Sequence, residues 1–264
     1  MCNRYLMAAG LSSYTTAALR NLGGFTVLLI IFLVKDRSVF RMKKAHLKYF
    51  FGTGVISVTM FTACYFSCQK FCSLAVASVL LYTAPSFVVV LSAILWKEPI
   101  TKKKLAALGL TLVGCACACG LFSGGMTVTG TGVLLGLGAG FFYALYSIFG
   151  RYALRAGYNS MAVTVWTFLF AGPASLIFLQ PPEINTMTSS MWLLALGMGL
   201  FSTALPYLLY TAGLSSVESG KASIMASLEP VVASLAGVLI FGEPMGILTL
   251  VGIICVLAGV YILR

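Results

Sequence analysis

The sequence has few charged side chains, and acidic ones are the scarcest, with 6 Asp and Glu against 17 Lys and Arg among 264 residues. Charged residues make up 9% of the chain, whereas a soluble domain contains about a quarter. Hydrophobic residues make up 60%, so too few polar side chains remain to cover a water-soluble core. A cytosolic globular enzyme and a disordered chain are therefore excluded, and a membrane protein remains.

Residues that carry common chemistries are also scarce. The one histidine, His46, lies in a basic segment, and the chain has no phosphate-binding loop, nucleophile elbow or paired soluble carboxylates. The eight cysteines lie mostly within apolar runs, which argues against a disulfide framework. Cys64, Cys68 and Cys72 have no histidine or carboxylate nearby on the same run, so a metal site is not expected. We expect no catalytic residues, no metal and no cofactor.

Long apolar runs are what the sequence does contain. A helix needs about 20 apolar residues to cross the roughly 30 Å of hydrocarbon in a bilayer. The runs are continuous, unlike the ten-residue alternating segments of a membrane barrel. The sequence therefore predicts an all-α polytopic membrane protein with about nine helical spans. Their ranges are 12–34, 47–66, 71–95, 105–122, 131–153, 160–179, 191–210, 217–241 and 246–263.

Most of the basic residues lie on one side of these spans. They follow the first, third and fifth spans, in segments 35–48, 97–104 and 151–155. The positive-inside rule makes this side cytoplasmic, so the net charge of +11 requires no nucleic-acid partner. We expect a multi-pass protein of the cytoplasmic membrane with a cytoplasmic C-terminus and an external N-terminus. Glu218 and Lys221, three residues apart near a cytoplasmic helix start, are expected to pair.

The chain repeats itself internally. Sliding it by 145 residues aligns a mid-span proline, Pro85 with Pro230, and a Glu-Pro pair just beyond it in each half. We therefore predict two repeats, residues 1–125 with four spans and residues 126–264 with five. Other aligned pairs are Tyr65 with Tyr210, Ser78 with Ser223, Glu98 with Glu243 and Gly114 with Gly259.

The first repeat has one span fewer than the second. Near the start of the chain, Arg4 and Ser13 align with Arg151 and Ser160 at an offset of 147. We expect an ancestral plan of ten spans whose first span is absent here, although a natural nine-span protein is the alternative. An odd number of spans per repeat threads the second repeat in the opposite sense, as in many secondary transporters.

Glu229 is the residue that most directly indicates chemistry, because it lies near the middle of the eighth span. A charged side chain at that depth costs roughly 2.5 to 3.5 kcal/mol, so it requires a cavity, a proton or a partner. It therefore predicts a substrate-binding or proton-coupling site. The alternative is a protonated Glu that hydrogen-bonds between helices.

Pro85 and Pro230 are expected to kink equivalent spans and to free a carbonyl in each. Paired interruptions of this kind indicate a site near the bilayer midplane, and the alternative is a packing kink without ligand contact. Further candidates for substrate binding are polar or aromatic residues within spans, although each aromatic one is also explained by packing, and Arg20 by reaching toward the interface. They are Arg20, Tyr65, Tyr82, Tyr143, Tyr146, Trp166, Tyr207 and Tyr210.

These motifs resemble those of the drug/metabolite transporter superfamily, in its EamA-like branch. The resemblance is carried by Trp96-Lys-Glu-Pro99, the segment Thr203-Ala-Leu-Pro-Tyr-Leu-Leu-Tyr-Thr-Ala-Gly213, and the residues from Lys221 through Glu229-Pro230 to Phe241-Gly-Glu-Pro244. It covers the chain from about Arg20 onward, and Arg20 is similar to the family's second-span arginine. The motifs are specific for the family and not for a substrate.

The resemblance implies two five-span repeats around a central cavity and secondary transport by alternating access. We expect export of a small metabolite, amino-acid-like or amphipathic, with proton coupling left open. The alternatives are a membrane-embedded enzyme or lipid-handling protein, and a truncated relative with no transport of its own. The expected partners are a small-molecule substrate and the lipid bilayer, and the oligomeric state is open.

Overall fold

The computed structural model describes residues 2–122, 127–241 and 245–263, and every regular element within these ranges is helical. The chain forms two compact units, and each unit joins segments from both halves of the sequence. Unit 1 comprises Met1–Phe66 and Phe149–Ser216, and unit 2 comprises Ser67–Ile148 and Val217–Arg264. The second Glu-Pro motif, Glu243-Pro244, lies outside the described residues.

Unit 1 is built from helices of both repeats. Two elements are shared, because α4 (Met60–Cys68) ends just inside unit 2, and α8 (Gly130–Arg155) begins in unit 2 and ends in unit 1. The others are α1 (Cys2–Ala8), α2 (Ser13–Lys35), η1 (Arg37–Phe40), η2 (Lys44–His46), α3 (Leu47–Phe51), η3 (Gly52–Thr59), α9 (Ser160–Ala174), η4 (Ser175–Phe178), α10 (Pro181–Asn185), α11 (Ser189–Met198), η5 (Gly199–Ala204) and α12 (Leu205–Ser216).

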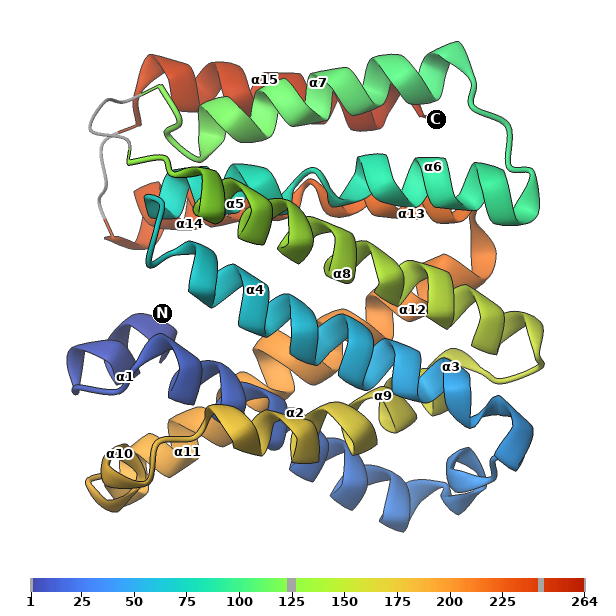
Figure 1. Cartoon of the computed structure of the whole chain (residues 1–264), viewed down its shortest axis with the longest axis vertical. Helices are drawn as coiled ribbons and strands as arrows, with labels where there is room; N and C mark the ends of the chain where they lie inside the picture. Colours follow the sequence, from blue (N-terminus) through green and yellow to red (C-terminus); the bar gives the residue numbers. More distant parts are fainter. Residues whose placement is uncertain (1, 123–126, 242–244, 264) are drawn as a thin grey trace. The chain divides into compact units, whose positions relative to one another are not determined.

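Unit 2 contains the two spans that carry the aligned prolines. Each of these spans is divided into two helices (Figure 1). The elements are α5 (Leu74–Leu81), α6 (Ala84–Trp96), α7 (Lys102–Ala118), most of α8, α13 (Ser219–Ala226), α14 (Glu229–Phe241) and α15 (Ile247–Ile262).

The helices lie where the apolar runs predict them. Within the described residues, seven helical segments are long and apolar enough to cross a membrane. The other two predicted spans correspond to α7 and α15, which have 17 and 16 residues. The described helices therefore support several membrane spans without confirming nine. The seven segments are Ser13–Lys35, Lys44–Cys68, Leu74–Trp96, Gly130–Arg155, Ser160–Phe178, Ser189–Ser216 and Ser219–Ile240.

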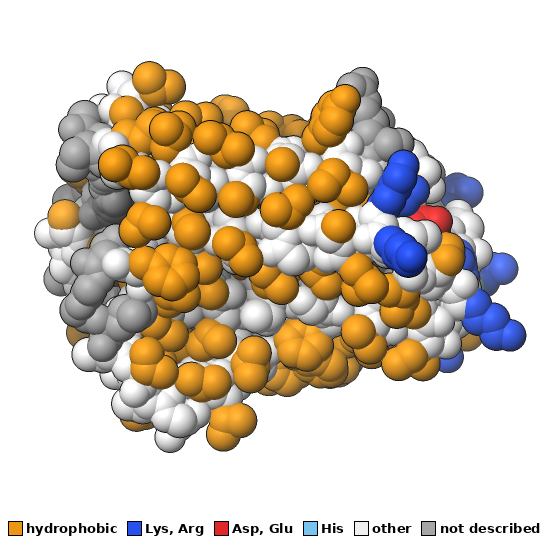
Figure 2. Space-filling view, turned by 90° about the horizontal axis from the view of Figure 1, so that it is seen from above, with side chains coloured by type: hydrophobic (Ala, Val, Ile, Leu, Met, Phe, Trp, Pro, Cys, Tyr) orange, Lys and Arg blue, Asp and Glu red, His pale blue; other side chains and the backbone are white. Residues whose placement is uncertain are grey.

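Large hydrophobic side chains cover the outside of these helices. Leu134, Leu239 and Ile247 are each more than 70% exposed, which a water-facing surface does not favour. On the face that carries α7 and α15, hydrophobic side chains cover most of the surface, and Lys and Arg gather at one end (Figure 2). A surface of this kind is suited to contact with lipid tails, with the charges at the interface.

The helix boundaries repeat as the sequence does. Adding 145 to the residue numbers of α5 and α6 gives the bounds of α13 and α14. The π-helical segments η3 and η5 both lead into a following helix, α4 and α12, whose first residues are again 145 apart. The two halves therefore share local structure at the places where helices are interrupted or wound differently.

Equivalent helices pack against each other in antiparallel pairs. In unit 2, Gly114 of α7 lies against Gly252 of α15, and Ala107 lies against Gly259. These two contacts are equivalent at the 145-residue offset, and an early residue of α7 meets a late residue of α15. Small residues at the crossing allow the two backbones to approach closely.

The same arrangement occurs in unit 1. Gly54 in η3 lies against Ala171 of α9, and Gly199 in η5 lies against Gly24 of α2. Residues 54 and 199 are 145 apart, and residues 24 and 171 are 147 apart, so the two contacts are again equivalent. The π-helical segments therefore occur where a helix backbone passes directly over a neighbouring helix, and such segments are often found at functional or strained positions.

A group of charged side chains lies at one end of unit 2, and it differs from the expected pairing of Glu218 with Lys221. Glu218 pairs with Lys104, at 2.6 Å between Oε2 and Nζ, and not with Lys221. Lys104 also lies 4.0 Å from Glu98, whose carboxylate accepts from the backbone N–H groups of Ser219 and Gly220. Lys104 is buried and requires a counter-charge, and Glu218 lies closer to its ammonium than Glu98 does.

Candidate functional site

The interruptions in unit 2 follow from proline chemistry. Pro85 and Pro230 have no N–H, so the carbonyls of Leu81 and Ala226, four residues earlier, receive no helical hydrogen bond from them. The helices stop at just these residues, α5 at Leu81 and α13 at Ala226. They resume at Ala84 and Glu229, each directly before its proline.

The two interrupted spans run in opposite directions. Glu98 follows α6 and binds the first N–H groups of α13, so the end of one span lies beside the start of the other. Helix α13 packs along α6 (Figure 1). A carboxylate at a helix N-terminus satisfies unpaired donors and complements the helix dipole, which fixes the register of the pair.

Glu229 and Tyr82 form the polar cluster at these interruptions. Tyr82 lies in the gap between α5 and α6, and its hydroxyl interacts electrostatically with the carboxylate of Glu229 at the start of α14. Glu229 is exposed, and Tyr82 is partly buried. The ring of Tyr82 packs against a core that includes Cys115 and Val231. Two residues 147 positions apart in sequence are thereby brought to one place.

Helix α8 passes close to the same interruption. A side chain at Gly140 would lie 2.7 Å from the hydroxyl of Thr83 and 2.9 Å from the carbonyl of Leu80. Tyr143 packs beside the start of α6 and interacts electrostatically with Tyr82. Tyr146, one turn further, is buried. Glu229 and Tyr143 therefore both lie near Tyr82 within unit 2, and Tyr146 lies next to Tyr143 on α8.

Arg20 belongs to unit 1 and lies one turn before the crossing at Gly24. Its Nε is buried and makes no hydrogen bond within the described part of the chain. The same holds for Oδ1 of Asn21 and the hydroxyl of Thr203, and a side chain at Gly24 would touch Thr203. Buried polar atoms without partners are rare and indicate function or strain. Asn21 and Thr203 are not among the candidates predicted from sequence, although Asn21 adjoins Arg20 in an apolar run.

The aromatic candidates of unit 1 are held by local packing. The indole N–H of Trp166 donates to the carbonyl of Val39 at 3.1 Å. Tyr207 meets Phe168 edge to face at 5.1 Å, and Tyr65 meets Phe66 at 5.4 Å. Tyr210 is partly buried. Trp166 therefore has a structural partner for its one polar atom, while the tyrosines contribute aromatic surface.

Titratable groups that could hold a metal do not gather in the described residues. Groups of three or more His, Cys, Asp or Glu side chains within reach of one ion are not found there. Cys68 instead lies 3.1 Å from the carbonyl of Gly132 at a helix crossing. Cys68 therefore packs where α4 meets α8.

Comparisons with known proteins agree on one family. The model of the EamA-like transporter family matches residues 1–119 and 130–264. Two proteins of Archaeoglobus fulgidus, each named "Uncharacterized transporter", are 32% identical over 76% of this chain and 70% of the relative, and 28% identical over 96% and 88%. A "Probable amino-acid metabolite efflux pump" of Salmonella typhimurium is 26% identical over 70% of this chain and 66% of its own length.

A solved crystal structure has the same fold. It matches with a TM-score of 0.79 at 19% sequence identity, over 97% of this chain and 88% of the other. At this identity the likeness is one of fold alone.

Proposed function

Because the chain belongs to the EamA-like transporter family, we propose that it is a secondary transporter that exports small amino-acid-like or amphipathic metabolites by alternating access. The family and the several long apolar helices make it a multi-pass membrane protein and a membrane transporter.

One observation carries the proposal, the pair of interrupted helices with Glu229 and Tyr82 between their halves. Unwound segments in corresponding spans of two repeats typically form the substrate site of secondary transporters. Here the freed carbonyls of Leu81 and Ala226 can accept hydrogen bonds, and the Glu229 carboxylate can bind an amine or a proton. The Tyr82 and Tyr143 hydroxyls supply further polar contacts. This set of groups fits an amine-bearing metabolite.

Three further observations support finer parts of the proposal. The antiparallel packing of α7 with α15 supports two repeats threaded in opposite senses through the membrane. The basic residues at one end of unit 2 support a cytoplasmic C-terminus by the positive-inside rule. The name of the Salmonella relative supports amino-acid-like substrates and export. Inverted repeats give inward-open and outward-open states of related energy, as alternating access requires.

Flux in proteoliposomes tests the proposal. Vesicles with the full chain would be loaded with radiolabelled neutral, acidic or aromatic amino acids, and efflux would be followed with and without an imposed pH gradient. We expect Glu229→Gln to lose most of the flux and its response to the gradient. Glu183→Gln, the same chemical change outside the spans, is the control and should transport like wild type.

Each outcome has a clear meaning. Unchanged flux in Glu229→Gln removes this residue from the mechanism. Wild-type protein that moves none of the probes contradicts amino-acid-like export and favours a chain without transport of its own.

A further inference from the structure

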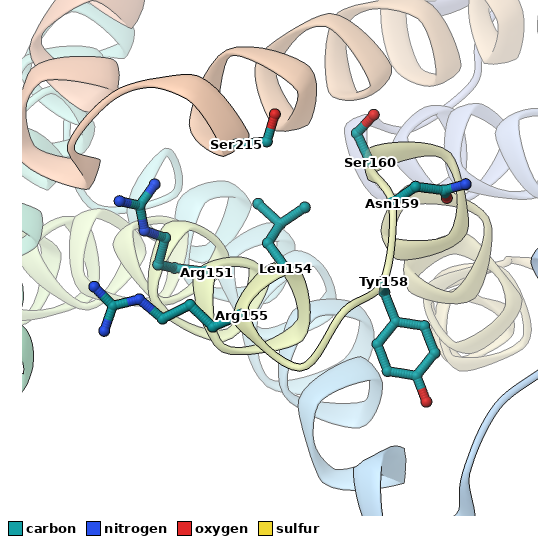
Figure 3. A pocket seen from close by; sticks show the side chains of 7 residues that line it. All are labelled: Arg151, Leu154, Arg155, Tyr158, Asn159, Ser160 and Ser215. Carbon is teal, nitrogen blue, oxygen red and sulfur yellow. The ribbon is translucent and has the colours of Figure 1, made fainter.

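A basic pocket in unit 1 lies apart from the residues discussed above. It has a volume of about 420 Å³ and is formed where α8 ends, α9 begins and α12 ends (Figure 3). We propose that this pocket binds a phosphate group, from the headgroup of an acidic phospholipid or from a free phosphate. The residues that line it are Arg151, Leu154, Arg155, Tyr158, Asn159, Ser160 and Ser215.

Two arginines set the charge of the pocket. Arg151 and Arg155 are one helical turn apart on α8, and no acidic side chain is among the residues that line the pocket. One guanidinium N–H of Arg151 donates to the carbonyl of Leu214, which anchors this side chain at the end of α12. A guanidinium has five N–H donors, and this bond uses one of them. Paired arginines are suited to phosphate because two N–H groups can meet two oxygens.

The other walls supply hydroxyls and a helix start. Ser215 comes from α12, and Ser160 is the first residue of α9 (Figure 3). The Asn159 side chain caps α9 by accepting from Ala162 N at 2.7 Å. The positive end of the α9 dipole therefore faces the same cavity as the arginines and adds to its attraction for an anion. The Tyr158 side chain points away from the others (Figure 3).

The equivalent helix start in the first repeat already holds an anion from the chain itself. Ser12, which aligns with Asn159 at the 147-residue offset, binds the carboxylate of Glu183 through its backbone N–H at 2.9 Å and its hydroxyl at 3.1 Å. The residue that aligns with Glu183 is Asp36. Its carboxylate accepts from Ser38 N at 2.8 Å instead and does not line the pocket. The start of α9 thus has an open, basic pocket where its counterpart has a bound carboxylate.

The predicted position in the membrane fits this ligand. The segment after α8 belongs to the basic side, which the positive-inside rule makes cytoplasmic. Acidic lipid headgroups are concentrated there, and basic pockets between helices bind them. The apolar side chain of Leu154 beside the arginines is compatible with a ligand that enters from the interface.

Binding of fluorescent phosphatidylglycerol to the purified full chain in detergent tests the proposal. The variant Arg155→Gln is preferred because Arg155 is exposed, so its loss should not prevent folding. We expect this variant to bind about fivefold more weakly, and Arg155→Glu more weakly still. Arg155→Lys should keep most of the binding. Arg41→Gln, an exposed arginine outside the pocket, is the matched control and should bind like wild type.

Competition between the lipid and inorganic phosphate identifies the source of the phosphate group. Displacement of the lipid by millimolar inorganic phosphate assigns the pocket to a free phosphate, and retained binding assigns it to the headgroup. The proposal is overturned if phosphatidylcholine binds as tightly as phosphatidylglycerol, if Arg155→Glu binds like wild type, or if Arg41→Gln weakens binding as much as Arg155→Gln.

Discussion

Lys104 and Glu218 form a short ion pair, 2.6 Å between Nζ and Oε2, in which the lysine side chain is 3% exposed. The pair joins the first turn of α7 to the residue that precedes α13, and Glu98 lies beside it. The second half has no such pair, because the residues that align with Lys104 and Glu218 are Thr249 and Ser73. One end of unit 2 is therefore fixed by charges, and this device is not repeated in the other half.

Removing the lysine should destabilise unit 2. Lys104→Met leaves the buried Glu98 carboxylate and Glu218 without their cation, and breaking a buried pair from one side is costly. Because the Glu218 side chain is partly exposed, we expect a loss of about 2 kcal/mol, below the range for fully buried pairs. Thermal unfolding in detergent should show a midpoint several degrees lower. Lys103→Met, at the exposed neighbouring position, should leave it unchanged, and equal midpoints for the two variants would contradict this role of Lys104.

The crossing of α7 and α15 provides a test with an internal control. A Cβ at Gly114 would lie 2.7 Å from the carbonyl oxygen of Gly252, so Gly114→Ala forces the two backbones apart. We expect a loss of about 1–3 kcal/mol in unfolding free energy. Gly109→Ala in the same helix meets nothing within 4 Å and should be neutral or slightly stabilising. Melting curves of the two variants test this expectation. A lower melting temperature for Gly109→Ala than for Gly114→Ala would contradict it.

The spans and their interruptions could be predicted from sequence because each has a local cause. Apolar run length determines where helices form, and Pro85 and Pro230 cannot donate an N–H, so the helices end shortly before them. The burial of Lys104 could not be predicted, because residues 102–104 are all lysine and only the tertiary packing determines which of them is buried. The unpartnered hydroxyl of Thr203 likewise depends on which helix crosses above it.

Glu183 should make stability depend on acid pH. Burial alone would raise its pKa, but the hydrogen bonds from Thr15 and Ser12 outweigh this and lower the pKa of Glu183 below its ordinary 4.5. A lowered pKa in the folded state means that the carboxylate stabilises the fold above pH 4.5, and that this contribution is lost as the pH falls below that value. Wild type should therefore lose more thermal stability between pH 6 and pH 3.5 than Glu183→Gln, as read from melting curves at each pH. Parallel losses in both proteins would show that this hydrogen-bonded carboxylate is not responsible.

Arg20 offers a test that separates function from folding. Its Nε is buried without a hydrogen bond, and a buried polar atom of this kind destabilises a fold by about 1–3 kcal/mol. Arg20→Met keeps an unbranched apolar side chain and removes the guanidinium, so we expect a higher melting temperature together with reduced transport in the proteoliposome assay. Arg41→Met, in an exposed loop, should change neither quantity. A side chain that serves to bind a ligand should destabilise the fold when the ligand is absent. A lower melting temperature for Arg20→Met would therefore show that Arg20 has a structural role.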